Sequence, residues 1–305
     1  MLLFLLRRLL TIIPVLVAAA TLSFGAIHLL PGDPVTQQMV ASGVSPEAIA
    51  ARRHALGWDR PLWVQYGEFV ARLARGDLGQ SWSSGRSVVT VIAEAAWPTA
   101  QLAVVAMLIA VLLGVGLGTL AAVRRGTWVD SASMVVALLG VSTPVAWGGL
   151  LAIVLFSLVL GWLPPSGSDG ARHLLLPGLV LGSASAGALA RLVRSSLLNV
   201  LAESYITAAY AKGLPGLLVL ARHAWPVTMP GLVAMMAVQF AFMMGGTAVT
   251  ETLFARQGLG RLMVEAVLTQ DLPLVQGLVL VSALVYSLAN LAADALHWSI
   301  DPRVR

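Results

Sequence analysis

The sequence contains no cysteine and a single lysine, and both features exclude kinds of chemistry. Without cysteine there is no disulfide, no thiolate ligand for zinc or an iron–sulfur cluster, and no covalent haem attachment. The lysine, Lys212, follows Ala211 and precedes Gly213. A phosphate-binding loop of the form GxxxxGK[ST] needs glycine before its lysine and Ser or Thr after it. The chain therefore has no nucleotide-binding loop of this kind.

Charge is also scarce, because only 11% of the 305 residues are charged whereas 58% are hydrophobic. Soluble domains average about 25% charged residues. The mean hydropathy of +0.86 is too high for a globule of this size in water. The composition therefore predicts a membrane protein. Its net charge of +5 is then explained by basic residues that fix the membrane orientation rather than by nucleic-acid binding.

Long uncharged stretches predict where the chain crosses the membrane. A spanning helix needs about 20 apolar residues, and six gaps between charged residues are long enough. The first apolar run exceeds the 7–15 residues typical of a signal peptide, so we expect it to be retained. The prolines and glycines of GWLPPSGS (161–168) end the third helix. We predict an all-α protein with six transmembrane helices at residues 9–29, 99–122, 133–160, 174–195, 228–250 and 274–297.

Basic residues in the short loops predict the orientation. They alternate onto one side, which the positive-inside rule makes cytoplasmic. We therefore expect a multi-pass membrane protein with both termini on the cytoplasmic side and residues 31–97 outside. The basic residues concerned are Arg7, Arg8, Arg124, Arg125, Arg191, Arg194, Lys212, Arg222, Arg303 and Arg305.

The outer segment carries the signals of two short helices. Residues 45–57 begin with a Ser cap and Pro and end at glycine, and residues 61–79 place apolar side chains on one face before Gly76. Together with LGQSWSSG they predict a compact outer cap that docks a partner. A helix pair lying on the membrane surface without a partner is the alternative.

Residues 200–226 form the longest cytoplasmic connection, between the fourth and fifth predicted spans. A helix through YITAAYAK ends with Lys212, which favours the negative helix end, and Gly213, which suits a left-handed cap. Pro215 and a second short helix follow. These helices predict a knuckle in which the small Ala208 and Ala209 allow another backbone to approach closely.

Residues suited to catalysis, metal binding or proton transfer are sparse. The five histidines include no pair at helical i, i+3 or i, i+4 spacing, so a helical zinc site is not expected. An intramembrane serine protease would need Ser142 and His297 together, but their predicted depths differ by more than about 10 Å. Glu251 and Asp294 lie near the ends of their helices, where they are wet or paired, so we expect no proton relay. Gly114/Gly118 and Gly178/Gly182 have the GxxxG spacing of close helix contacts or of ordinary bundle packing.

The motifs along the chain resemble those of one family. LLRRLLTIIPVL, LLPGDPV, LGWDRPLWVQYGEFVARLARGDLGQS, VRRGTWVDS, GWLPPSG, GGTAVTETLFARQGLGRLMVEAVLTQDLPLVQG and NLAADALHWSIDPRVR occur in this order. They are similar to the inner-membrane permease subunits of binding-protein-dependent ABC importers of the dipeptide, oligopeptide and nickel type. The resemblance divides the chain into a first transmembrane helix (1–30), an extracytoplasmic loop region (31–97) and a five-helix permease core (98–305).

The resemblance gives YITAAYAKGL the role of the EAA loop, a cytoplasmic coupling helix that sits in a cleft of the partner ATPase. Thr207 and Tyr210 stand where arginine is usual, and the apolar PGLLVL and the stretch WPVT replace charged or basic segments. These departures put the detailed ATPase contacts in doubt or indicate a specialised partner. The implied coupling residues are Tyr205, Thr207, Ala208, Ala209, Ala211, Lys212, Gly213, Leu214 and Arg222.

The resemblance further implies a transport subunit rather than an enzyme. It would work with a second, similar permease, two ATPase subunits that bind ATP and magnesium, and an extracytoplasmic solute-binding protein, without a cofactor of its own. Short peptides are the first expected substrate, with a nickel or metal chelate or glutathione as alternatives. A protease or a membrane scaffold is the alternative of another class. The expected residues of the translocation path are Ser142, Thr143, Pro144, Gln239, Met243, Met244 and Thr247.

Overall fold

A computed structural model describes residues 2–29, 36, 45–55, 57–168 and 170–300. Within these ranges the chain is helical, and its β-structure is limited to an isolated bridge between Gln80 and Ser87. The all-α prediction is confirmed. The LLPGDPV motif and the basic residues of the C-terminal tail lie largely or wholly outside the described residues.

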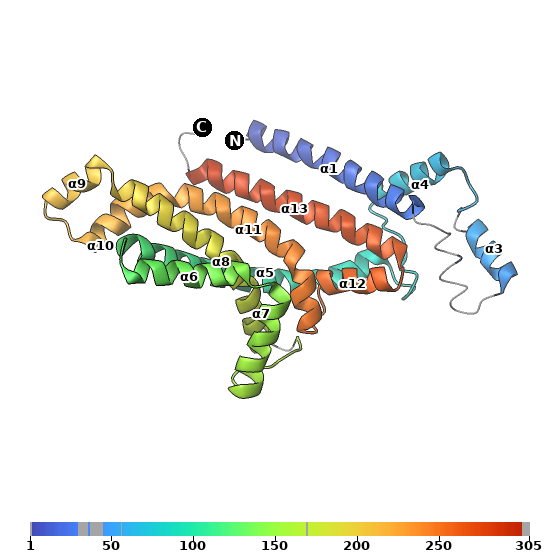
Figure 1. Cartoon of the computed structure of the whole chain (residues 1–305). Coiled ribbons are helices and arrows are strands. Elements are labelled where there is room, and N and C mark those ends of the chain that lie inside the picture. The colour runs from blue at the N-terminus through green and yellow to red at the C-terminus, as the bar shows by residue number, and fades with distance from the viewer. Residues whose placement is uncertain (1, 30–35, 37–44, 56, 169, 301–305) are drawn as a thin grey trace. The chain divides into compact units, whose positions relative to one another are not determined.

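The longer helices correspond to the predicted spans (Figure 1). Within the part of the chain that the structure describes, five are long and apolar enough to cross a membrane, or six if one bent pair counts as a single span. The helices that contain the predicted spans are α1 (Leu2–Leu29), α5 (Val88–Val123), α6 (Trp128–Ser142) with α7 (Val145–Ala152) and the π-helix η1 (Ile153–Val159), α8 (Arg172–Leu201), α11 (Trp225–Leu253) and α13 (Leu272–Ile300).

The prediction of one continuous third helix at 133–160 is wrong. Its two parts meet at an angle of 107° between Ser142 and Val145. Pro144 has no backbone N–H for the helical ladder, and it forces Thr143 into an extended conformation with φ −81° and ψ 118°. The helix therefore breaks at this point in the middle of an apolar stretch.

Among the described residues, five shorter helices and one further π-helix accompany the long helices. Two of the short helices, α3 (Pro46–Ala55) and α4 (Leu62–Ala74), confirm the two helices predicted within residues 45–57 and 61–79, whose position outside the membrane stays a prediction. The sequence did not predict α12, which is too short to span a membrane and lies beside charged residues. The remaining elements are α9 (Ser204–Ala211), α10 (Gly216–Val219), η2 (Leu220–Ala224) and α12 (Leu259–Leu268).

The chain folds as two compact units, and each unit combines two segments that are far apart in the sequence. The first comprises residues 1–96 and 262–287, and the second comprises residues 97–261 and 288–305. In the first unit, Phe69 of α4 packs with Ala20 of α1 and Leu280 of α13. The predicted division at residues 30 and 97 follows membrane position and stays a prediction.

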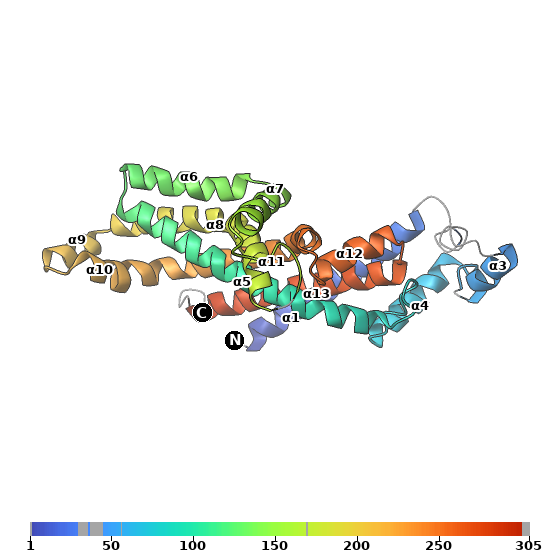
Figure 2. The same ribbon diagram turned by 90° about the horizontal axis from the view of Figure 1, so that it is seen from below.

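Glycines bring α5 and α8 into close contact in the second unit. A Cβ added at Gly114 would lie 2.6 Å from the Leu189 Cβ, and one added at Gly182 would lie 2.6 Å from the Ala106 carbonyl oxygen. Both GxxxG pairs therefore face the partner helix, as small residues do in membrane bundles. Figure 2 shows α6 running beside α8, and a Cβ at Gly187 would lie 2.3 Å from the Ala137 carbonyl oxygen.

Candidate functional site

The segment after α8 forms the predicted knuckle. Helix α9 ends at Ala211 with Lys212 as its C-cap, and Gly213 takes a left-handed conformation with φ +80°. The Gly213 N–H donates to the Tyr210 carbonyl at 2.9 Å and the Leu214 N–H to the Ala209 carbonyl at 3.4 Å. This is a Schellman-type helix end, which glycine accommodates without strain. Pro215 then starts α10, so the corner predicted at Gly-Leu-Pro is confirmed.

The knuckle is built into the core of the second unit. Ile206 of α9 and Val219 of α10 are buried in one cluster with Leu197 and Val200 of α8. Figure 1 shows α9 and α10 at one end of α8 and α11. Since apolar packing joins the knuckle to both long helices, a displacement of the knuckle displaces them too.

Most of the predicted coupling residues lie on the outer surface of this knuckle. Ala209 is the exception, because it is buried and holds α9 against the core, and Leu214 is half-buried. The exposed members are Tyr205, Thr207, Ala208, Ala211, Lys212, Gly213 and Arg222.

An ion pair near the knuckle was not predicted. Arg194 of α8 donates from Nε and Nη2 to the two carboxylate oxygens of Asp130 in α6, each at 2.7 Å. The Gly126 N–H donates to the same carboxylate at 3.1 Å. Such a bidentate pair fixes orientation as well as distance. The sequence indicated Arg194 only as an orientation signal, because 64 residues separate the partners.

The structure brings only some of the predicted path residues to a common place. Ser142, Thr143 and Pro144 form the break between α6 and α7, and Thr143 lines an apolar cavity of about 380 Å³. Gln239 donates to the Ser185 carbonyl at 3.2 Å and so joins α11 to α8. Met244 is half-buried, whereas Met243 and Thr247 are buried inside the bundle.

Glu251, near the end of α11, accepts several hydrogen bonds. This agrees with the expectation that its carboxylate is either hydrated or paired. It is fully buried, and it accepts from the Thr99 hydroxyl at 2.6 Å and from the Gly260 and Arg261 N–H groups at 2.8 and 3.1 Å. These N–H groups belong to the first turn of α12, where backbone donors lack helical partners. Glu251 therefore ties α11, α12 and α5 together.

Asp271 has a similar role in the first unit. It is fully buried, and it accepts from the Ser81 and Ser83 hydroxyls at 2.6 and 2.7 Å and from the Ser83 N–H at 3.0 Å. Burial acts to raise the pKa of Asp271, but the hydrogen bonds from Ser81 and Ser83 outweigh it and hold the pKa below its usual value. The LGQSWSSG stretch is thereby attached to the start of α13.

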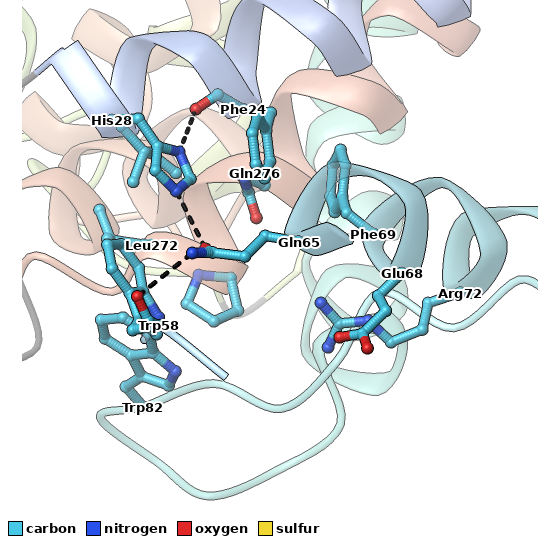
Figure 3. Close-up of a pocket in the computed structure, with 12 residues that line it drawn as sticks. Phe24, His28, Trp58, Gln65, Glu68, Phe69, Arg72, Trp82, Leu272 and Gln276 are labelled. Carbon is cyan, nitrogen blue, oxygen red and sulfur yellow. Dashed lines mark hydrogen bonds between the residues drawn. The ribbon is translucent and has the colours of Figure 1, made fainter. Parts of the chain in front are cut away.

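An unpredicted pocket opens in the first unit between α1, α4 and α13 (Figure 3). The Trp58 ring stacks on His28 with ring centroids 5.1 Å apart. His28 hydrogen-bonds through Nδ1 to the Phe24 carbonyl (2.9 Å) and through Nε2 to Gln65 (3.2 Å), and the Gln65 amide donates to the Trp58 carbonyl (3.2 Å). The cavity measures about 110 Å³, and Trp82 and Gln276 also line it. Its residues come from segments far apart in the chain, so no local sequence signal marks it.

Comparisons with known proteins match the chain along its whole length. Residues 114–305 match the family described as "Binding-protein-dependent transport system inner membrane component". Residues 1–103 match the family described as "Binding-prot-dependent transport system membrane comp, N-term".

Two named relatives align with this chain over its full length. The glutathione transport system permease protein GsiC of Salmonella choleraesuis (strain SC-B67) is 41% identical over 305 residues, which is 100% of this chain and 99% of that protein. The protein of the same name in Escherichia coli (strain K12) is 39% identical with the same coverage.

The fold also resembles that of a solved transporter. Two inward-facing crystal forms of the MetNI methionine ABC transporter superpose with TM-scores of 0.57 and 0.59 at 19% and 20% identity. The first match covers 70% of this chain and 97% of the other, and the second covers 69% and 96%. The matches to the family and to its full-length relatives assign the chain: it belongs to the binding-protein-dependent transport system inner membrane components, the multi-pass permease subunits of ABC importers.

Proposed function

We propose that this permease carries glutathione, or a short peptide closely similar to it, into the cytoplasm. The observation that supports this proposal most strongly is the 41% identity over the whole chain to a glutathione transport system permease. The sequence led us to expect short peptides first and glutathione as an alternative, and glutathione is itself a tripeptide. Family membership leaves no support for the protease and scaffold alternatives.

The knuckle formed by α9 and α10 is the part of the chain that docks on the ATPase. Small or short side chains such as Ala208, Ala211 and Gly213 are exposed on it, so a second protein can approach its backbone. Its inner face, with Ile206 and Val219, is packed into the core that contains α8. This arrangement supports a rigid joint that transmits a push from the partner to the transmembrane helices.

The other subunits that we propose are those of a binding-protein-dependent importer. Two ATPase subunits bind ATP and magnesium and supply the energy, a second permease completes the pathway, and an extracytoplasmic solute-binding protein delivers the substrate. Both termini and the knuckle face the cytoplasm, in agreement with the distribution of basic residues in the short loops.

The coupling proposal is tested by adding a side chain at Gly213 without straining the backbone. Asn tolerates positive φ better than other non-glycine residues, and an added Cβ at Gly213 meets nothing within 4 Å. Gly213→Asn should therefore leave folding intact and obstruct the ATPase contact. We expect ATPase co-purification and ATP-driven glutathione uptake in proteoliposomes to fall by about tenfold, equivalent to about 1.4 kcal/mol of lost binding.

Gly76 provides a matched control. It follows α4 with φ +75°, an added Cβ there also meets nothing within 4 Å, and its N–H donates to Leu73 while that of Asp77 donates to Arg72. Gly76→Asn makes the same change at the same type of helix end, and ATPase co-purification should be unchanged. Equal loss in both variants, or no loss in Gly213→Asn, would refute the coupling role. Peptide or metal uptake by the wild-type importer without glutathione uptake would refute the substrate alone.

A further inference from the structure

We propose that the pocket of Figure 3 is part of an extracytoplasmic site on this chain for a short zwitterionic peptide. The pocket adjoins a second cavity of about 340 Å³ in the same unit. Five residues line both cavities: Phe69, Arg72, Trp82, Pro273 and Gln276. The larger cavity alone reaches the roughly 300–1,000 Å³ typical of small-molecule sites. The inference rests on the substrate class proposed above and extends it to a place on the chain.

Among the described residues that line the two cavities, one arginine, Arg72, is available to a ligand. Arg72 of α4 lines both of them, and among the described residues its guanidinium has no hydrogen-bond or ion-pair partner. Glu68, an acidic residue that lines the smaller pocket, forms an ion pair with Arg60 and not with Arg72. A guanidinium binds a carboxylate through two parallel hydrogen bonds. Arg72 is thus available for a carboxylate of the ligand.

An anion and neutral polar groups complement this cation. Asp77 lines the larger cavity, where its Oδ1 accepts from the Gly79 N–H at 2.8 Å and its Oδ2 has no partner within the described chain. Asp77 is therefore available for an ammonium group. The half-buried Gln276 offers an amide that both donates and accepts.

Aromatic rings provide the apolar part of the site. Phe69 is buried and Trp82 is half-buried, and both line the two cavities. Trp58 is held in place by its stack on His28. Apolar walls with a few fixed polar groups characterise small-molecule sites. A cation, an anion and an amide within such walls match the carboxylate, ammonium and peptide groups of a short peptide.

The test measures peptide binding to the permease pair in lipid nanodiscs without the solute-binding protein. Glutathione is titrated while tryptophan fluorescence is recorded, because Trp58 and Trp82 line the pocket. We expect a saturable change that shrinks in amplitude in Trp82→Phe. Arg72→Gln, or glutathione dimethyl ester as the ligand, should weaken binding by about tenfold or more, because a charged hydrogen bond is lost.

Arg75→Gln is the matched control, since Arg75 lies three residues further along the same exposed helix end and lines neither cavity. Its affinity for glutathione should equal that of the wild type. No saturable response in the wild type, or the same loss in Arg75→Gln, would overturn the proposal. So would an Arg72→Gln variant that loses only docking of the solute-binding protein. Uptake by the complete importer separates the outcomes: wild-type glutathione uptake without binding at this pocket refutes the site but not the proposed substrate.

Discussion

The contact between α5 and α8 allows one substitution to be predicted in both sign and magnitude. A Cβ added at Gly118 would lie 2.6 Å from the Ala190 carbonyl oxygen and 2.8 Å from the Val193 Cβ, whereas ordinary contact begins at 3.4 Å. Neither obstacle is the end of a flexible side chain. Gly118→Ala therefore forces the two helices about 0.8 Å apart or displaces the α8 backbone. Overpacking of this kind costs about 1–3 kcal/mol.

Gly116 provides the control on the same helix. An added Cβ there meets nothing within 4 Å, so Gly116→Ala changes only the local preference of the backbone. Alanine is favoured over glycine in a helix by about 0.8–1.0 kcal/mol. The two variants make the same chemical change two residues apart, so the gain in helix preference is common to both, and they should differ in stability by the overpacking cost of about 1–3 kcal/mol.

The assay is unfolding of the detergent-solubilised chain, followed by tryptophan fluorescence during titration with a denaturing detergent. Gly116→Ala should unfold at or above the wild-type midpoint, and Gly118→Ala clearly below it. Recovery of each variant from the membrane fraction verifies insertion. Equal midpoints for the two variants would show that α5 and α8 do not pack through Gly118, and the close contact described above would be wrong.

Two further predictions concern buried carboxylates. Since the pKa of Asp271 is lowered in the folded chain, its stabilising contribution is fully present above the usual value of about 3.9 and is lost as the pH falls through the lower, folded value. Asp271→Asn should reduce stability at neutral pH by about 1–3 kcal/mol and abolish this acid-dependent loss, which stability measurements between pH 7 and 3 would detect; an unchanged pH profile would contradict the assignment. Arg194→Met leaves Asp130, whose side chain is 8% exposed, without its ion-pair partner. We expect a loss of stability smaller than for a fully buried pair, because Arg194 is 31% exposed and solvent screens its interaction with Asp130. The double variant Asp130→Leu/Arg194→Met should recover most of this loss, and a double-mutant cycle measures the recovery.

Features that depend on local composition were predictable from the sequence. Uncharged stretches located the transmembrane helices, and Gly213 and Pro215 located the corner of the knuckle, because membrane thickness and backbone conformation leave few alternatives. The break at Pro144 was missed because the prediction weighed the length of the apolar stretch and not the single proline within it.

Features that depend on distant contacts were not predictable. The pairing of Asp130 with Arg194 and the bonding of Asp271 to Ser81 join residues 64 and 190 positions apart. No periodicity indicates which partners meet. The pocket of Figure 3 likewise assembles Trp58 and Trp82 with residues from both ends of the chain.

These contacts show how a push on the proposed coupling knuckle reaches the broken helix. Ile206 and Leu197 share one buried cluster, so α8 moves with α9. Arg194 holds Asp130 through two hydrogen bonds, so the start of α6 must follow α8. At the other end of α6, Pro144 interrupts the backbone ladder between α6 and α7. A rotation of α6 is therefore taken up at the break, where Thr143 faces the apolar cavity. This series of contacts joins the proposed coupling knuckle to the break between α6 and α7.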